Sequence, residues 1–217
     1  MDNKTYTQSY SPYLESMVKR CFDITICLIL IVPVILILML VLPIVFIIDG
    51  CPILFFQRRI GKNGKRFLMP KIRSLNNHAH PDRPSCSYDI DSFTTKTGRF
   101  LRKHRIDELP QIFSVLSGKM SLVGPRPELP DVVENYSTTE RKRLCAKPGI
   151  TGLWQIKAAR NQPIHKNIEY DFYYLKNASL WFDLRILCET IPFVLKAKSK
   201  IFYGKNRLYT YNISLPK

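Results

Sequence analysis

The chain has few acidic residues, only one long apolar run and no close pair of cysteines. Each of these shortages argues against particular kinds of site or protein. Its six cysteines form no Cys-x-x-Cys pair and are scattered at positions 21, 27, 51, 86, 145 and 188. This spacing argues against a zinc site and against a disulfide framework, and it suits a reducing cytoplasm.

Acidic residues number 17 against 33 lysines and arginines, which gives a net charge of +16. Residues 1–23 carry three cations and three anions, so the whole excess belongs to residues 49–217. An excess of this size indicates an anionic partner, such as nucleic acid, lipid headgroups or a nucleotide-linked substrate. No nucleic-acid-binding motif is recognisable, and the basic residues are interleaved with prolines instead of lining one helix. We therefore expect no nucleic acid partner.

The single long apolar run extends from Ile24 to Ile48, and Thr25 is its only clearly polar residue. It exceeds the roughly 20 residues that a helix needs to cross the hydrocarbon of a bilayer. No small-residue cleavage site follows it, which argues against a cleavable signal peptide. Pro33 and Pro43 interrupt it, and each removes a backbone donor and disfavours a straight helix.

Basic residues flank both ends of this run, with Lys19 and Arg20 before it and Arg58 and Arg59 after it. A simple spanning helix shows a bias of cations to one side, and this bias is absent here. Two topologies stay open: a single-pass helix, and a re-entrant hairpin that breaks near Pro33 and returns to the cytoplasmic face.

The remaining residues suit one soluble domain. Periodicity and turn residues predict strands over 52–57 and 65–73, joined by a turn at 61–64. A polar loop is expected over 76–92, and we interpret His78 and His80 as loop residues and not as metal ligands. Apolar spacing predicts helices over 107–117 and about 184–195. The second carries Leu184, Leu187, Cys188, Ile191 and Leu195, and could lie on lipid or pack against the core.

Asp107 and Glu108 stand at the start of the first of these helices, with Pro110 in its first turn and Gly118 as a stop signal. Unpaired amides and the helix dipole favour negative charge at this position. Adjacent helical residues point about 100° apart, so the two carboxylates suit separate roles: one as a nucleophile, the other as a metal ligand or base. The alternative is a pair of acids that only stabilises the helix end.

Two turns could complete a site. Pro125 and Pro127 fix the backbone around Arg126, so its guanidinium fork loses little entropy on binding a phosphate. Alternatively, this is a rigid turn with a solvent-facing arginine. A second turn, Lys147 to Gly152, could line a pocket.

Taken together, the chain resembles the bacterial sugar transferases, the monotopic phosphoglycosyl transferases, in their short form. The resemblance covers about residues 17 to 196 and rests on eight motifs in order: Lys19–Asp23, Phe56–Gly61, Lys71–Ser74, Gly98–Arg102, Asp107–Gln111, Met120–Glu128, Pro148–Gln155 and Tyr170–Tyr174. In that family the apolar run is a re-entrant helix with a break at a Ser-Pro pair, for which this chain has Val32-Pro33.

The resemblance implies a mixed α/β, mostly helical fold in four parts: an interfacial segment (1–23), a membrane-embedded hairpin (24–48), a cytoplasmic catalytic domain (49–200) and a tail (201–217). It implies the transfer of a sugar 1-phosphate from a UDP-sugar to polyprenol (undecaprenyl) phosphate at the bacterial inner membrane, with release of UMP. This would be the first membrane step of exopolysaccharide, capsule, O-antigen or glycoprotein glycan assembly, with downstream glycosyltransferases as further partners.

Residue by residue, the resemblance makes Asp107 the nucleophile and places Mg²⁺ with Glu108. The family positions for substrate binding and support fall on Lys71, Arg73, Arg102, Arg126 and Asp171. The identity of the sugar and the oligomeric state stay open.

Overall fold

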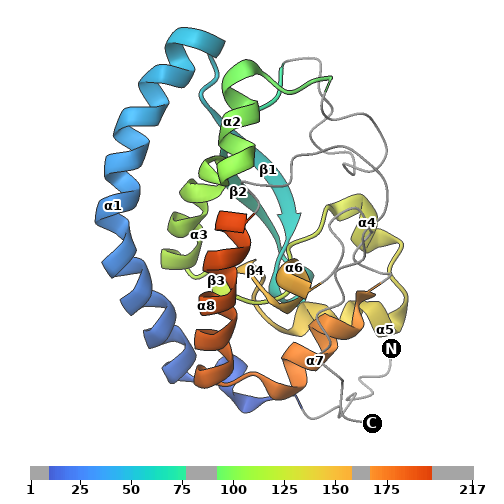
Figure 1. Cartoon of the computed structure of the whole chain (residues 1–217). Helices are drawn as coiled ribbons and strands as arrows, with labels where there is room; N and C mark the ends of the chain where they lie inside the picture. The colour runs from blue at the N-terminus through green and yellow to red at the C-terminus, as the bar shows by residue number, and fades with distance from the viewer. Residues whose placement is uncertain (1–9, 77–91, 158–166, 197–217) are drawn as a thin grey trace.

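The structure, a computed structural model, describes residues 10–76, 92–157 and 167–196 (Figure 1). The tail at 201–217, His78, His80 and most of the predicted polar loop lie outside these residues. Within them the fold is mixed and mostly helical, as predicted, with two small two-stranded sheets.

The described elements follow one another along the chain as η1 (Pro12–Glu15), α1 (Met17–Asp49), β1 (Leu54–Ile60), η2 (Lys62–Gly64), β2 (Arg66–Ile72), α2 (Lys96–His104), η4 (Ile106–Gln111), α3 (Ile112–Leu116), β3 (Ser121–Val123), α4 (Pro130–Glu134), α5 (Thr138–Arg141), η5 (Lys142–Cys145), β4 (Gly149–Thr151), α6 (Leu153–Lys157), α7 (Glu169–Asn177) and α8 (Leu180–Lys196).

The predicted pair of strands is confirmed as a β-hairpin, because β1 and β2 pair antiparallel from Leu54↔Ile72 to Ile60↔Arg66. Its turn contains two residues with left-handed backbone, Asn63 (φ 56°) and Gly64 (φ 75°). Asparagine and glycine tolerate this conformation better than other residues, which explains why the chain reverses here.

The second sheet pairs β3 and β4 in parallel. The turns that follow the two strands interlock, since Gly124 N donates to Thr151 O (3.0 Å) and Gly149 N donates to Pro125 O (2.9 Å). A Cβ on Gly124 would lie 2.5 Å from the Lys147 carbonyl oxygen, so only glycine permits this approach. The turn that carries Arg126 is thereby fixed to the edge of the sheet.

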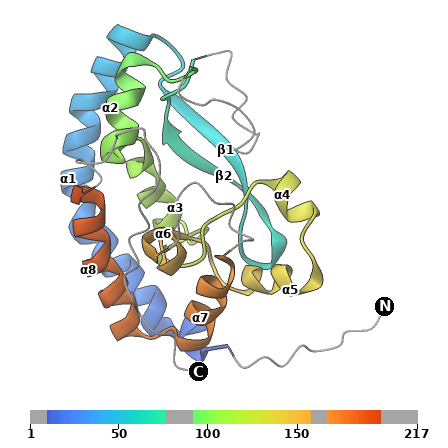
Figure 2. The same cartoon turned by 45° about the vertical axis from the view of Figure 1, so that its right-hand side comes forward.

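Helix α1 is continuous from Met17 to Asp49 and includes both prolines. The break expected near Pro33 is absent from it, so the re-entrant hairpin is not confirmed. Both prolines lie on the exposed side. A proline ring opens a helix on its own side, and α1 accordingly curves around the rest of the protein (Figures 1 and 2).

One face of α1 belongs to the core of the protein. Its buried residues recur every four or seven positions: Lys19, Asp23, Cys27, Val34, Leu38 and Val45. They pack mainly against α3 and α2, which lie along α1 in both views (Figures 1 and 2). The opposite face is apolar and exposed between Leu28 and Ile48. By length and composition α1 is able to cross a membrane, and it is the one helix among the described residues that passes this test.

Helix α8 confirms the predicted C-terminal helix but not the whole of its predicted apolar stripe. Ile186 is buried, and Thr190 lies 2.8 Å from Thr151 through their hydroxyl oxygens. Cys188 and Ile191, which the stripe included, are exposed. The residues that face the core are thus offset from the stripe, because Asp183 is drawn inward by Lys19 and Tyr174.

Candidate active site

Asp107 and Glu108 lie in a short 3-10 helix, η4, that joins α2 to α3. Arg105 ends α2 in the left-handed conformation (φ 59°), and the chain re-enters helical geometry at Ile106. The predicted helix over 107–117 is therefore confirmed in position, with a 3-10 first half that contains Pro110 and an α-helical second half that stops before Gly118 (φ 76°). Strand β2 packs against η4 and carries Lys71 to its side.

The two carboxylates have opposite electrostatic surroundings. Asp107 is buried, with 7% of its surface exposed. Burial and the neighbouring charge of Glu108 raise its pKa, against the opposing effect of Lys71 and Arg102. A carboxylate with a raised pKa holds its proton more tightly and is a stronger nucleophile once it is ionised.

At Glu108 the neighbouring cations outweigh the effect of burial, whereas at Asp107 they do not. Burial acts to raise the pKa of Glu108, but Arg105, Lys71 and Arg126 outweigh it and lower the pKa below its ordinary value. Arg105 Nη1 donates to Glu108 Oε2 at 3.3 Å. Glu108 is therefore ionised throughout the physiological range, which suits a ligand for a cation. Two adjacent acids with pKa values shifted apart suit two different roles.

Three of the predicted substrate-binding residues lie around this pair. Burial lowers the pKa of Lys71 to about 8, and Glu108 acts on it in the opposite direction. The charges of Arg102 and Arg126 also act on the pair, Arg102 on Asp107 and Arg126 on Glu108. Both side chains are half-buried, and within residues 10–76, 92–157 and 167–196 neither guanidinium has a hydrogen bond or an ion pair, so both are available to an anionic ligand.

The backbone of Arg126 is held in place by a buried ion pair. Arg143 donates to the Arg126 carbonyl oxygen (2.9 Å), and it also binds Asp171 through Nε (2.8 Å) and Nη2 (2.6 Å). Arg143 and Asp171 have side chains only 1% and 2% exposed. Asp171 is thus paired with a protein cation, and through Arg143 it supports the backbone of Arg126. Its contact with substrate stays a prediction.

Arg73 also has a different place from the one expected. Its guanidinium donates to the carbonyl oxygens of Asp49, Gly50 (2.8 Å) and Cys51 (2.7 Å), which are the free acceptors at the C-terminal end of α1. A cation there complements the negative end of the helix dipole. Arg73 therefore ties the end of β2 to the end of α1, and its part in substrate binding stays a prediction.

The sequence reasoning missed two residues of the site. Arg105 makes the ion pair with Glu108, and its position three residues before Glu108 is the signal that could have found it. Arg143 was not singled out, because its partners Asp171 and Arg126 are distant in sequence and no local pattern brings them together.

A magnesium ion fits the acids of this site. Mg²⁺ is usually bound by one or two carboxylates together with substrate phosphates and water. The described residues hold no group of three or more acids, histidines or cysteines that could form a complete protein cage. Asp107 and Glu108, which are adjacent and have Lys71, Arg102 and Arg126 around them, match the first arrangement.

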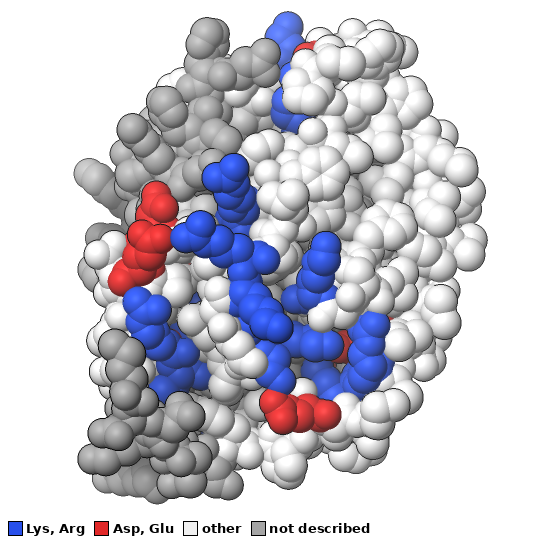
Figure 3. Space-filling view, turned by 180° about the vertical axis from the view of Figure 1, so that it is seen from behind, with Lys and Arg blue, Asp and Glu red and all other residues white. Residues whose placement is uncertain are grey.

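Charged and uncharged side chains occupy separate parts of the protein surface seen in Figure 3. Figure 3 shows lysine and arginine side chains gathered on one face, beside a broad region almost free of charge. The uncharged region lies on the side of the molecule along which α1 runs (Figures 1 and 3). A basic face that adjoins an apolar face suits a protein that works on anionic substrates at a membrane surface.

Comparison with known proteins identifies the family to which the chain belongs. The model of the bacterial sugar transferase family matches residues 14–197. The galactosyl transferase CpsE of Streptococcus agalactiae is 36% identical over 203 residues, which are 88% of this chain and 45% of CpsE. The sugar transferase EpsL of Bacillus subtilis is 38% identical over 82% of this chain and 88% of EpsL.

The UDP-N-acetylgalactosamine-undecaprenyl-phosphate N-acetylgalactosaminephosphotransferase of Aeromonas hydrophila is 40% identical over 66% of this chain and 36% of that protein. The chain thus spans less than half the length of CpsE and of the Aeromonas protein, and most of the length of EpsL. With a family match over nearly all described residues, the chain belongs to the bacterial sugar transferases.

Proposed function

We propose that this protein transfers a sugar 1-phosphate from a UDP-sugar to undecaprenyl phosphate, with Asp107 as the nucleophile. The observation that carries the proposal is the buried Asp107 carboxylate beside ionised Glu108, bordered by Lys71, Arg102 and Arg126. The relatives' names support the same donor and acceptor, since the Aeromonas protein is named for a UDP-sugar and undecaprenyl phosphate.

In the first step an oxygen of ionised Asp107 attacks the phosphorus that carries the sugar. The bond from this phosphorus to the oxygen shared with the second phosphate breaks, and UMP leaves with the electron pair. The product on the protein is an acyl phosphate that joins Asp107 to the phosphosugar. A carboxylate is repelled by a diphosphate, so the charges of Lys71, Arg102 and Arg126 are needed to bring the two together.

In the second step a phosphate oxygen of undecaprenyl phosphate attacks the same phosphorus. The bond to Asp107 breaks, the carboxylate is regenerated, and the sugar leaves on a lipid diphosphate. A covalent intermediate lets a water-soluble donor and a membrane-bound acceptor use one small site in turn. Ping-pong kinetics are expected.

Glu108 would hold Mg²⁺ together with the donor phosphates, and the ion would supply charge neutralisation to the diphosphate. Arg105 lies on the same carboxylate and keeps it ionised and oriented. Glu108 thus has a partner in the protein on one side and is free to bind a cation with its remaining lone pairs.

We also propose that residues before α1 and the catalytic domain lie on the same, cytoplasmic, side of the inner membrane. The start of α1 is bound to the domain by Asp23, whose Oδ1 accepts from Leu122 N (3.1 Å), and its end is bound by Arg73 and by Thr95, which donates to Asp49 (2.8 Å). A helix of this length is about 50 Å long. If it crossed a bilayer once, the contacts at one end would have to be broken.

Cysteine labelling tests this topology. Variants Ser9→Cys and Ser92→Cys are made in a background without the native cysteines and exposed to a membrane-impermeant thiol reagent in intact cells. Same-side topology requires both to be protected until the cells are permeabilised. Labelling of the Ser9→Cys variant from outside would show that the helix crosses.

The chemistry is tested by incubating the purified chain with a panel of UDP-sugars and magnesium, and measuring UMP release after undecaprenyl phosphate is added. Intact-mass measurement should detect a phosphosugar adduct in the wild type. Asp107→Asn should abolish both turnover and adduct, because the amide has no anionic oxygen to attack phosphorus. An adduct in that variant would exclude Asp107 as the nucleophile.

A further inference from the structure

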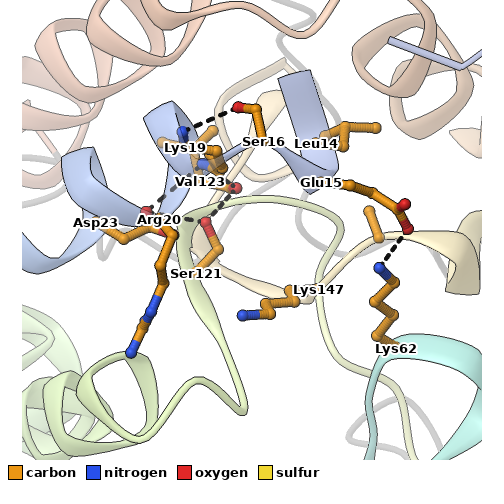
Figure 4. Close-up of a pocket in the computed structure, with 11 residues that line it drawn as sticks. Leu14, Glu15, Ser16, Lys19, Arg20, Asp23, Lys62, Ser121, Val123 and Lys147 are labelled. Atoms are coloured by element: carbon orange, nitrogen blue, oxygen red, sulfur yellow. Dashed lines mark hydrogen bonds and ion pairs between the residues drawn. The ribbon is translucent and has the colours of Figure 1, made fainter. Parts of the chain in front are cut away.

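A cavity of about 280 Å³ near the start of α1 is lined by charged residues that have no role in the proposed reaction (Figure 4). Six charged side chains line it: Glu15, Lys19, Arg20, Asp23, Lys62 and Lys147. Neither Asp107 nor Glu108 belongs to its lining. Four cations face two carboxylates, so the lining carries an excess of positive charge.

Two of the four cations are neutralised within the protein. Lys19 Nζ lies 2.5 Å from Asp183 Oδ2 and 3.6 Å from Asp23 Oδ1, and this cluster is buried. Lys62 Nζ lies 2.5 Å from Glu15 Oε1 near the surface. Neither of these lysines requires a further partner.

The other two cations, Arg20 and Lys147, have no ion pair with any residue that the structure describes. Among the described residues, the Arg20 guanidinium donates to main-chain carbonyl oxygens, those of Val115 and Leu116, both at 2.7 Å. These hydrogen bonds satisfy carbonyl oxygens at the end of α3 and orient the guanidinium, but neither acceptor carries a formal negative charge. Lys147 is half-buried, and no hydrogen bond or ion pair of its ammonium group is found among the residues that the structure describes.

Arg20 and Lys147 converge on one point. A Cβ placed on Gly118 would lie 3.7 Å from Arg20 Nη2 and 3.7 Å from Lys147 Nζ. In Figure 4 the Lys147 side chain points into the cavity, toward the side that Arg20 and Ser121 occupy. Burial lowers the pKa of Lys147, and the positive charge of Arg20 lowers it further, against the opposing effect of Asp23. Two such cations are held close together at a cost that an anion between them would remove.

We propose that this cavity binds a phosphate or phosphodiester group through Lys147 and Arg20, at a site separate from Asp107 and Glu108. A guanidinium and an ammonium group are the side chains that bind phosphate oxygens most strongly. The exposed apolar residues Met17 (76% exposed) and Val18 (54%) begin α1 next to the cavity. The same phosphate chemistry is offered by an anionic lipid headgroup, whose chains would lie on that apolar surface, and by a soluble phosphate ester.

The test measures anion binding to the full chain without a UDP-sugar or undecaprenyl phosphate, so it does not depend on the proposed reaction. In detergent, inorganic phosphate is titrated by calorimetry. In lipid nanodiscs, retention of phosphatidylglycerol is compared with that of phosphatidylcholine by native mass spectrometry. The variant is Lys147→Gln, and the matched control is Lys176→Gln, which removes the same charge from an exposed position on α7.

Lys147→Gln should weaken binding about tenfold or more, since a hydrogen bond to a charged group is worth about 1.5–3 kcal/mol. Lys176→Gln should leave binding unchanged. A loss of phosphate binding alone identifies a soluble ester as the ligand, and a loss of phosphatidylglycerol retention alone identifies a lipid headgroup. If wild type, variant and control bind both probes equally or bind neither, the proposal is wrong.

Asp107→Asn separates this proposal from the proposed function. That variant should bind the anion as the wild type does while losing turnover. Anion binding that disappears with Asp107→Asn but survives Lys147→Gln would place the anion at the active site and would overturn the second site.

Discussion

The buried pair of Arg143 and Asp171 gives the sharpest prediction about stability. Burial raises the pKa of Asp171 in spite of Arg143. Burial acts to lower the pKa of Arg143, but the negative charge of Asp171 outweighs it and raises that pKa, so the buried guanidinium depends on Asp171 to stay charged. Removing one partner is different, because Asp171→Asn leaves a fully buried guanidinium without its counter-ion. Such a loss costs about 3–5 kcal/mol. For a chain of this size we expect the Tm to fall by about 6–20 °C.

Differential scanning fluorimetry of the purified chain measures this effect. The control is Glu134→Gln, which breaks an exposed ion pair with Arg66 (3.3 Å, side chains 69% and 66% exposed) and should shift the Tm hardly at all. The double variant Arg143→Met, Asp171→Leu should recover much of the loss, since apolar residues of similar volume need no counter-ion. A Tm for Asp171→Asn equal to that of Glu134→Gln would refute this reasoning.

Three further predictions concern the site and its connection to α1. Glu108→Gln should lower kcat strongly, and raised magnesium should restore much of the rate if Glu108 holds the metal; rescue by no concentration of magnesium would point to a different role. The acid limb of the pH–rate profile should lie above the ordinary pKa of aspartate, because Asp107 must lose its proton to attack. Arg105→Gln should move this limb to higher pH, since Arg105 lowers the pKa values of both acids. A limb that stays in place would show that neither acid controls it. Arg73→Gln should lower the Tm, because it frees the carbonyl oxygens at the end of α1, and should leave the KM for the UDP-sugar unchanged. The control Arg58→Gln, an exposed change on the β1–β2 hairpin, should change neither the Tm nor the KM. A raised KM with an unchanged Tm for Arg73→Gln would show that Arg73 binds substrate.

Local patterns in the sequence were enough to place most elements that carry the site. The hairpin of β1 and β2 follows from alternation and a glycine turn, and the position of Asp107 and Glu108 follows from the apolar spacing after them. The left-handed residue Arg105, which separates α2 from η4, could not be found this way, because arginine carries no turn signal.

Long-range partners account for the rest of the differences. Arg73 and Asp171 stand in motifs that suggest substrate binding, but their partners at Asp49 and Arg143 are 24 and 28 residues away along the chain. The path of α1 at Pro33 was also beyond local reasoning: a proline predicts a bend, and packing against α2 and α3 decides how large the bend is.

The way α1 is built into the core has a consequence for how the protein is made. Truncating the chain before Asp49 to obtain a soluble enzyme would expose the partners of Val34, Leu38 and Val45 and would remove Lys19, the cation that pairs with Asp183. The catalytic domain should therefore not fold as an independent unit, and truncated versions should aggregate. Because the same helix offers its other face to lipid, the active site would be completed only in chains that have reached the membrane, where the acceptor is found.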